Sequence, residues 1–245
     1  MTDRVKQRQG SIRVGTSGWE YDSWADPFYG GCRPRLEAYA ERFSTVEVNG
    51  TFYGLPDPNV VADWASRVGD DFVFAAKASR YITHMKKLKD PAEPVSRLFD
   101  ALEPFGQRLE VVLFQLPPGW GCNPERLRCF LAELPDSVRC TFEFRDPSWY
   151  NDEVYAILEE SNVAFCIYHL GGHESPRTVT ADFVYIRLHG AGGRYRGSYS
   201  NEELAAWTGA VTSWARSGRD VYLYFDNDQG AAAPHDASRL AAMVS

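Results

Sequence analysis

Eight short segments of β character recur along the chain, and segments with helical spacing separate most of them. This alternation constrains the fold more than any other feature, because strands that alternate with helices are typical of a parallel sheet. Eight such units in 245 residues match the size of a TIM barrel. The expected strands cover residues 12–17, 45–49, 72–77, 111–116, 141–145, 163–168, 183–189 and 221–226.

A doubly wound open sheet is the rival architecture, and the end of the first expected strand argues against it. Gly15 to Trp19 do not form the G-x-G-x-x-G fingerprint of such sheets. The sequence therefore predicts an α/β fold, a (β/α)8 TIM barrel. Its helix after the sixth strand is expected to be missing or irregular, because residues 169–182 carry glycines, a proline and no helical pattern.

Helices are expected between most strands, and no linker divides the chain. Ser200 and Glu203 have the spacing of a capping box at the start of one of them. Residues 1–245 are expected to form a single TIM-barrel domain, with residues 1–11 as a flexible N-terminal tail. The expected helices cover about 33–43, 58–68, 94–105, 124–134, a segment from 151 or 152, 200–216 and 234–243.

Charge and composition exclude several classes of protein. The net charge of −7 and an isoelectric point near 5.3 argue against nucleic-acid binding through overall charge. The five cysteines show no metal-type spacing and suggest reduced thiols in a cytoplasmic protein. No segment approaches the roughly 20 apolar residues that span a membrane, so no membrane partner is expected.

The fifth expected strand carries charge on one face and aromatic rings on the other. Phe142 and Phe144 share one parity, whereas Glu143 and Arg145 share the opposite parity. In a barrel one parity packs on helices and the other points inward, where buried charge is costly unless paired. Other strands place polar residues at inward positions near their carboxyl ends, where barrel enzymes carry their chemistry. These residues are Glu47, Asn49, Lys77, Gln115, Arg187, His189 and Asp226.

Four of the inward residues are candidates for catalysis, and each has a structural alternative. Glu47 and Glu143 could transfer protons, or could pair with Lys77 and Arg187. Lys77 could be a nucleophile that forms a Schiff base, a charge partner or an anion ligand. His189 could carry a proton, or could be a hydrogen-bonded barrel histidine.

A larger set could bind substrate. Arginine and lysine suit a phosphate or carboxylate, and loop aromatics stack on sugar rings or bases when they do not simply pack. His84 lies in a basic loop that is either solvated or binds phosphate. The expected substrate-binding residues are Trp19, Asn49, Tyr53, His84, Gln115, Arg145, Trp149, Arg187, Tyr195, Tyr199, Asp226 and Asn227.

A metal site is an alternative use of the acidic residues. Glu47, Glu143, His189 and Asp226 could form an oxygen-rich site for a divalent metal, Mg²⁺ or Mn²⁺. Cations at inward positions of neighbouring strands would oppose a metal there. The sequence therefore establishes no cofactor and leaves the metal as an alternative.

Several stretches along nearly the whole chain resemble the YecE-like family, domain of unknown function 72, which is described as sugar-isomerase-related. The resemblance implies a TIM barrel and no defined reaction. Asp226 departs from the family pattern, where asparagine is expected. The matching stretches are 14–19, 46–49, 51–53, 77–78, 82–84, 114–118, 142–145, 148–149, 185–190 and 227–228, with Gly230 and Ala233.

Together these features predict an enzyme, isomerase-like or hydrolase-like, that acts on a small anionic or sugar-like molecule. Its acid/base chemistry would take place at the C-terminal mouth of the barrel. One alternative is a metal-assisted sugar isomerase or hydrolase, as the resemblance suggests. Another is a non-catalytic protein that binds nucleic acid or other phosphorylated ligands, which the acidic isoelectric point disfavours. The sequence does not determine the substrate or the oligomeric state.

Overall fold

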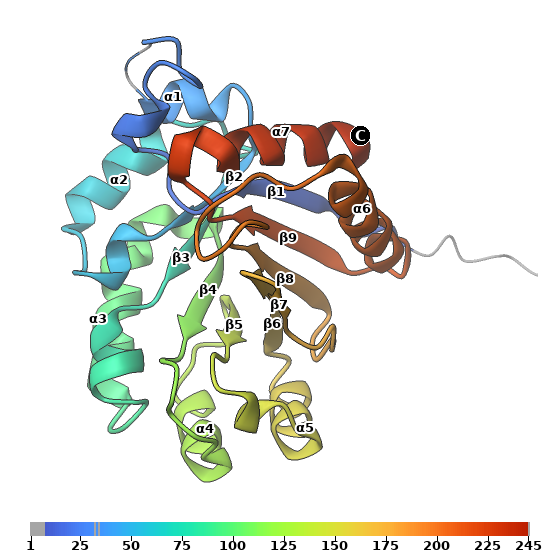
Figure 1. Cartoon of the computed structure of the whole chain (residues 1–245). Helices are drawn as coiled ribbons and strands as arrows, with labels where there is room; N and C mark the ends of the chain where they lie inside the picture. Colours follow the sequence, from blue (N-terminus) through green and yellow to red (C-terminus); the bar gives the residue numbers. More distant parts are fainter. Residues whose placement is uncertain (1–7, 32, 34, 245) are drawn as a thin grey trace, which may run out of the picture.

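Eight parallel strands form a nearly closed barrel, with helices around its outside (Figure 1). The structure is a computed structural model, and it describes residues 8–31, 33 and 35–244. Around the barrel each strand pairs with its neighbour in the order β1, β9, β8, β6, β5, β4, β3, β2. The strands are β1 (Ile12–Thr16), β2 (Thr45–Val48), β3 (Val73–Lys77), β4 (Leu109–Gln115), β5 (Arg139–Glu143), β6 (Ala164–Leu170), β8 (Phe183–Leu188) and β9 (Asp220–Phe225).

The barrel closes where β1 meets β2. A single bridge joins Ser17 to Glu47, and the backbone N–H of Gly18 donates to the carbonyl of Glu47 at 2.7 Å. The predicted TIM-barrel fold is therefore confirmed, with closure at this seam limited to the carboxyl ends of the two strands.

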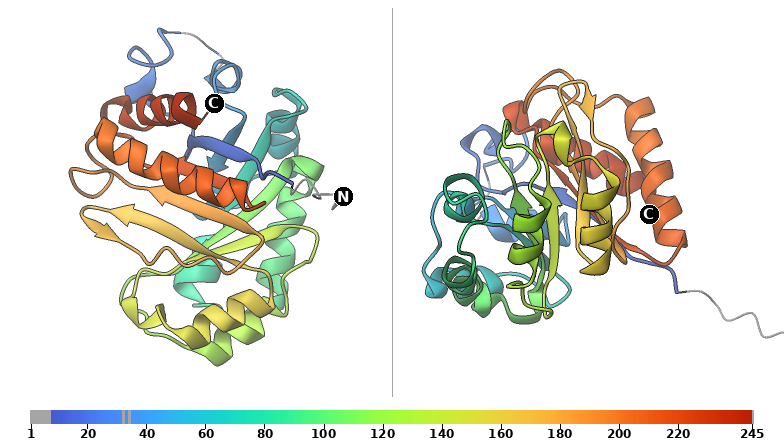
Figure 2. Two further views of the ribbon diagram at one scale, coloured as in Figure 1. Left: turned by 90° about the vertical axis from the view of Figure 1, so that its right-hand side faces the viewer. Right: turned by 90° about the horizontal axis from the view of Figure 1, so that it is seen from below.

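Helices follow most strands, as the sequence predicts, and begin at recognisable caps. Side chains of Asp57 and Asn151 accept backbone N–H groups, and Ser200 with Glu203 forms the expected capping box. Helices α6 and α7 lie side by side over β9 and β1, away from α4 and α5 (Figure 2). The helices are α1 (Arg35–Ala40), α2 (Pro58–Ser66), α3 (Ala92–Leu102), α4 (Pro124–Leu131), α5 (Asp152–Glu160), α6 (Asn201–Arg216) and α7 (Ala232–Val244).

The connection after β6 has no helix, as expected. β6 turns into a short antiparallel hairpin with β7 (His173–Glu174). The hydroxyl groups of Ser175 and Thr180 then accept the backbone N–H groups of Tyr168 and Phe165, at 2.9 and 2.8 Å. These side chains hold the connection against the strand, so it is ordered without being helical.

Two apolar layers follow from the alternation of side chains along the strands. The layer between strands and helices contains Phe142 and Phe144, as predicted. A smaller layer fills the barrel interior toward its amino end, and above it lie the charged side chains. This inner layer consists of Ala75, Val111, Leu113, Ala164, Cys166, Phe183, Tyr185, Tyr222 and Tyr224.

The start of the described chain is tied to the barrel. Arg8 pairs with Asp220 at 3.2 Å, and the backbone N–H of Ser11 donates to the same carboxylate at 2.9 Å. The rest of the expected flexible tail, residues 1–7, lies outside the described residues. Within the described chain, none of the helices has the length and apolar character needed to cross a membrane.

Candidate active site

Arg187 lies at the centre of the charged side chains above the inner apolar layer. It comes from β8, is fully buried, and donates to carboxylates of β2, of β5 and of the residue after β9. Nη1 lies 2.8 Å from Glu143, and Nη2 lies 2.8 Å from Glu47 and 3.0 Å from Asp226. The expected role of Arg187 as an anion clamp is therefore corrected, because three carboxylates already surround its guanidinium.

Glu47 and Glu143 are committed to the same network. Glu47 also accepts hydrogen bonds from Ser17 and Tyr185, both at 2.6 Å. Glu143 pairs with the Nε of Arg145. Burial alone would raise the pKa of Glu143, but the charges of Arg145 and Arg187 hold it well below its ordinary value.

Because both glutamates are fully buried, neither meets solvent at the mouth. Glu143 in addition stays ionised at neutral pH, which makes it a poor proton donor. Both glutamates therefore serve as ion-pair partners, which was the alternative to proton transfer. Their partner is Arg187 and not Lys77.

His189 connects this network to the mouth. Its Nε2 lies 3.1 Å from Nη2 of Arg145, and its Nδ1 lies 2.9 Å from Oδ2 of Asp226. Since a guanidinium only donates, Nε2 must accept, and the proton of a neutral ring then sits on Nδ1 facing Asp226. Burial alone would raise the pKa of Asp226, but the charge of Arg187 and the contact with His189 keep it below its ordinary value.

A cavity of about 500 Å³ opens at the C-terminal mouth, between the loops that follow β4, β5, β6 and β8. Arg145 lines it, with its guanidinium 4.7 Å from the ring of Tyr168. Tyr195 also lines it, edge-on to His189 at 5.4 Å. Among the described residues that line this cavity there are two arginines, Arg145 and Arg194, and no carboxylate. Expected residues Gln115, Arg145 and Tyr195 therefore share one cavity.

Lys77 ends β3 and stands apart from the ion pairs. Its Nζ lies 4.4 Å from the ring centre of Phe52 and makes no ion pair with any described residue. Burial, helped by the charge of Arg187, lowers the pKa of Lys77 to about 8, although Asp226, Glu143 and Glu47 oppose the change. A charge-partner role for Lys77 is therefore not what the geometry favours.

His84 lies near Lys77 although it comes from the expected basic loop. That segment forms a π-helix, Tyr81–Met85, and the His84 ring packs edge-on to Phe52 at 5.0 Å. Its Nδ1 lies 2.9 Å from the hydroxyl of Thr83. Burial, followed by the charges of Lys77, Arg80 and Arg145, lowers the pKa of His84, so the ring is neutral at pH 7.

Asp228 is a candidate that the sequence did not single out. Burial, followed by the charge of Asp226, raises the pKa of Asp228 to about 8. Two carboxyl groups two residues apart thus hold opposite protonation states near pH 7. Asp228 lies past the end of β9 and directly before a short 3₁₀ turn, Gln229–Ala231, so no strand pattern marks it in the sequence.

Four expected substrate-binding residues pack into the protein instead. Trp19 lies edge-on to Trp64 at 5.4 Å, and Trp149 stacks on Phe144 at 4.8 Å. Both indoles are buried. They follow strands in the chain, but the next turns direct their rings toward the helices, so their expected contact with substrate is corrected.

Tyr199 and Asn227 are the other two, and both hold loops in place. The Tyr199 hydroxyl accepts the N–H of Gly190 at 3.1 Å. Asn227 donates to Gly197 and to Asp236, both at 2.9 Å. These hydrogen bonds position the loop after β8, and they use the Tyr199 hydroxyl and the Asn227 amide nitrogen.

Asn49 and Tyr53 follow β2 and differ in exposure. Asn49 Oδ1 is buried and receives no hydrogen bond from the described residues. Tyr53 is 77% exposed and touches Phe52 edge-on at 5.2 Å. Neither lines the cavity at the mouth.

The residues considered for a metal do not fit one. Glu47, Glu143 and Asp226 all point at the Arg187 guanidinium, which occupies the space that a cation would need. No group of three or more potential ligands within the described part of the chain could hold a metal ion. The prediction that these residues could bind a metal is therefore corrected, because the three carboxylates surround the guanidinium of Arg187 instead.

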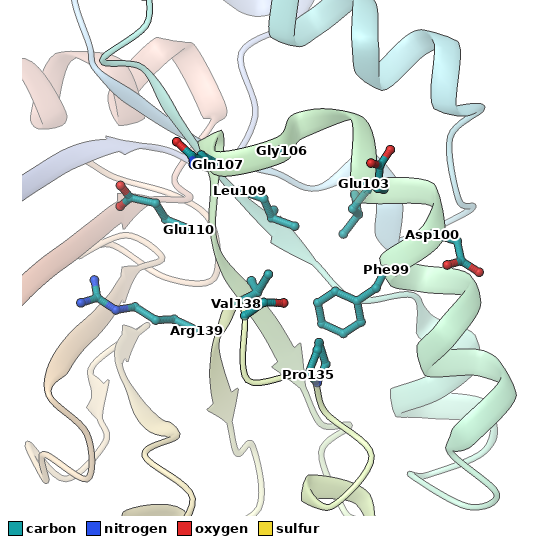
Figure 3. Close-up of a pocket in the computed structure, with 12 residues that line it drawn as sticks. Phe99, Asp100, Glu103, Gly106, Gln107, Leu109, Glu110, Pro135, Val138 and Arg139 are labelled. Atoms are coloured by element: carbon teal, nitrogen blue, oxygen red, sulfur yellow. The ribbon is translucent and has the colours of Figure 1, made fainter.

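A larger cavity of about 760 Å³ opens at the opposite end of the barrel, where β4 and β5 begin (Figure 3). Phe99, Leu109 and Val138 form its apolar part, and three carboxylates stand around it. It lies away from the charged network, which occupies the carboxyl ends of the strands. The smaller cavity is therefore the candidate site.

Comparisons with known proteins identify relatives over nearly the whole chain. The model of a family described as protein of unknown function DUF72 matches residues 13–245. The UPF0759 protein YunF of Bacillus subtilis (strain 168) is 26% identical over 264 residues, which cover 94% of this chain and 93% of that protein.

Solved structures agree with the barrel fold. A DUF72 family protein of Thermotoga maritima MSB8 superposes with a TM-score of 0.86 and 27% identity, over 96% of this chain and 99% of that one. A D-allulose 3-epimerase of Methylomonas sp. shares the fold alone. Its TM-score is 0.57 at 12% identity, over 97% of this chain and 96% of the epimerase.

Proposed function

This chain belongs to the DUF72 family of proteins of unknown function, and we propose that it is an enzyme acting on a small anionic or sugar-like substrate. The substrate binds in the cavity at the C-terminal mouth, and the reaction proceeds by acid/base chemistry. Barrel enzymes place their active sites at this end of the strands.

One observation carries the proposal: the mouth cavity is lined by Arg145 and Arg194, and by no described carboxylate, in a chain whose net charge is −7. Such a lining attracts phosphates and carboxylates, to which arginine donates two parallel hydrogen bonds. Arg145 also contacts His189 at 3.1 Å, so an anion bound to Arg145 would lie next to the His189 ring.

Acid/base chemistry is supported by carboxyl groups held in different protonation states. Asp226 is held ionised, while the pKa of Asp228 is raised to about 8. Environments that shift the pKa values of two neighbouring titratable groups in opposite directions are typical of acid and base pairs. We assign Asp228 as the proton donor and the ionised Asp226 as the proton acceptor, with His189 positioned between Asp226 and Arg145. Glu47, Glu143 and Arg187 have a structural role.

A thermal-shift screen tests the binding step. Sugar phosphates and sugar acids come first, because one barrel of the same fold is a D-allulose 3-epimerase, and small organic acids complete the set. A ligand at 100 times its Kd stabilises a protein by about 2.7 kcal/mol, which raises the Tm of a chain of this size by about 5–10 °C.

The matched variants are Arg145→Gln and Arg97→Gln, which each remove one positive charge. Arg97 pairs with Glu93 on the exposed face of α3, so its loss leaves the mouth untouched. We expect Arg97→Gln to keep the ligand-induced shift and Arg145→Gln to lose most of it. Equal shifts in both variants would place the ligand elsewhere. Oligonucleotides that bind with a steep salt dependence, while small anions do not bind, would favour the nucleic-acid alternative.

A further inference from the structure

Resting on this proposed function, we propose that Lys77 is a nucleophile that forms an imine with the carbonyl carbon of an anionic aldehyde or ketone bound at the mouth. The inference names the substrate class: a small carbonyl compound that also carries a phosphate or carboxylate.

The first support is the position of Lys77 among charges that are already paired. The guanidinium nitrogens of Arg187 lie 2.8 to 3.0 Å from oxygens of the three inward carboxylates. Lys77 makes no ion pair with a described residue. Its Nζ rests over the ring of Phe52 at 4.4 Å. Lys77 as a whole residue is half-buried and ends its strand at the mouth, at the same end of the barrel as the cavity.

The second support is the protonation state that this position produces. Burial and the neighbouring Arg187 lower the pKa of Lys77 to about 8. About a fifth of the amine is then unprotonated at pH 7.4, against about a thousandth for an ordinary lysine. Only the unprotonated amine attacks a carbonyl group, and desolvation is a recognised way to activate it.

The third support is a neutral histidine nearby. His84 packs on the same Phe52 ring as Lys77, and its pKa is lowered by burial and then by the charge of Lys77. The charge of Arg145 also lowers the pKa of His84, so both cations favour the neutral form of this ring. A neutral imidazole can accept the proton that the amine loses and return it to the departing oxygen.

The reaction balances without a further reactant. Nζ forms a bond to the carbonyl carbon while the C–O π electrons move to the oxygen, and the nitrogen gives one proton to His84. The oxygen takes that proton from His84 and a second proton from solvent, so that the imine is formed in its protonated state. The C–O bond then breaks, and the oxygen leaves as water while the nitrogen lone pair completes the C=N bond. Water reverses the same steps and releases the product.

Reductive trapping tests the inference. The protein is incubated at pH 7.4 with glyoxylate, pyruvate, glyceraldehyde 3-phosphate or dihydroxyacetone phosphate, and sodium cyanoborohydride converts any imine into a stable secondary amine. Peptide mass spectrometry then locates the adduct. We expect Lys77 to be modified at least about tenfold faster than the loop lysines Lys86, Lys87 and Lys89, because more of it is unprotonated.

Three variants separate the outcomes. Lys89→Met should be labelled at Lys77 like the wild type, while Lys77→Met and Lys77→Arg should carry no mouth adduct; the arginine variant keeps the positive charge. Labelling of Lys77 no faster than that of the loop lysines overturns the inference. If these compounds raise the Tm in an Arg145-dependent way and yet form no adduct, the imine inference fails and the proposed function stands. If no anion in the screen raises the Tm, the proposed function fails by its own test.

Discussion

Replacing Lys77 by methionine should stabilise the protein at neutral pH. The buried ammonium has a pKa of about 8 in place of 10.5, and at 1.36 kcal/mol per pH unit this difference corresponds to a cost of at most about 3 kcal/mol. Methionine keeps an apolar chain against Phe52 and a sulfur–aromatic contact in place of the cation–π contact. We expect a net gain of about 1–3 kcal/mol in the free energy of unfolding.

The gain should depend on pH in a defined direction. The folded-state pKa of Lys77 is lowered, so the cost is present in full below pH 8 and disappears as the pH rises toward 10.5. Urea unfolding, followed by tryptophan fluorescence, measures the free energy of unfolding at pH 7 and pH 10. The advantage of Lys77→Met should be largest at pH 7 and small at pH 10.

The exposed lysine Lys89 provides the control, since Lys89→Met should change stability by less than about 0.5 kcal/mol. A loss of 1 kcal/mol or more in Lys77→Met at pH 7 would refute the reasoning. It would mean that the charge of Lys77 is paired in the folded protein and that the amine is not poised for reaction.

Three further predictions follow from the same contacts. Arg187→Met should lower the free energy of unfolding, measured in urea, by at least about 3–5 kcal/mol, because three buried carboxylates lose their partner. A change close to zero would mean that these ion pairs do not stabilise the barrel. Asp228→Asn should become more stable relative to the wild type as the pH rises from 4 to 8. Because the pKa of Asp228 is raised in the folded protein, its contribution to stability is fully present below the unfolded pKa of 3.8 and is lost as the pH rises toward 8. If the urea midpoints of the variant and the wild type differ by the same amount at every pH in this range, the pKa of Asp228 is not raised. Trp149→Phe should cost about 1–3 kcal/mol by removing the hydrogen bond to Trp120 and part of the packing, while the ligand-induced Tm shift stays unchanged; loss of that shift would return Trp149 to the binding site.

The barrel could be predicted from the sequence because its signals are local. Strands such as β5 alternate aromatic and charged residues with a period of two, and that period places Glu143 inside and Phe144 outside whatever the distant contacts are. The missing helix after β6 was equally visible, since glycine and proline interrupt any helical pattern there.

The use of the inward charges could not be predicted in the same way. Parity places Lys77 and Arg187 in one volume, but only the three-dimensional structure decides which cation meets the carboxylates. The planar guanidinium of Arg187 donates hydrogen bonds to three of them. The ammonium of Lys77 instead makes a cation–π contact with the ring of Phe52. Of the two partners that the sequence suggested for Glu47 and Glu143, the structure therefore selects Arg187 and not Lys77.

The loop aromatics show a second limit. Trp149 lies only six residues beyond the end of β5, yet Asp146 caps a short 3₁₀ turn, Pro147–Trp149, that directs the indole against Phe144. The raised pKa of Asp228 likewise depends on burial beside Asp226, which no spacing in the chain reveals.

The most direct test of the account is a proton NMR time course in D₂O, with each ligand that stabilises the wild type. It records both conversion of the ligand and exchange of its carbon-bound hydrogens. The account predicts conversion or exchange with the wild type, and a large loss of both in Asp228→Asn while the ligand still binds. If every ligand that binds in an Arg145-dependent way stays chemically unchanged, the mouth is a binding site and the enzymatic proposal is wrong.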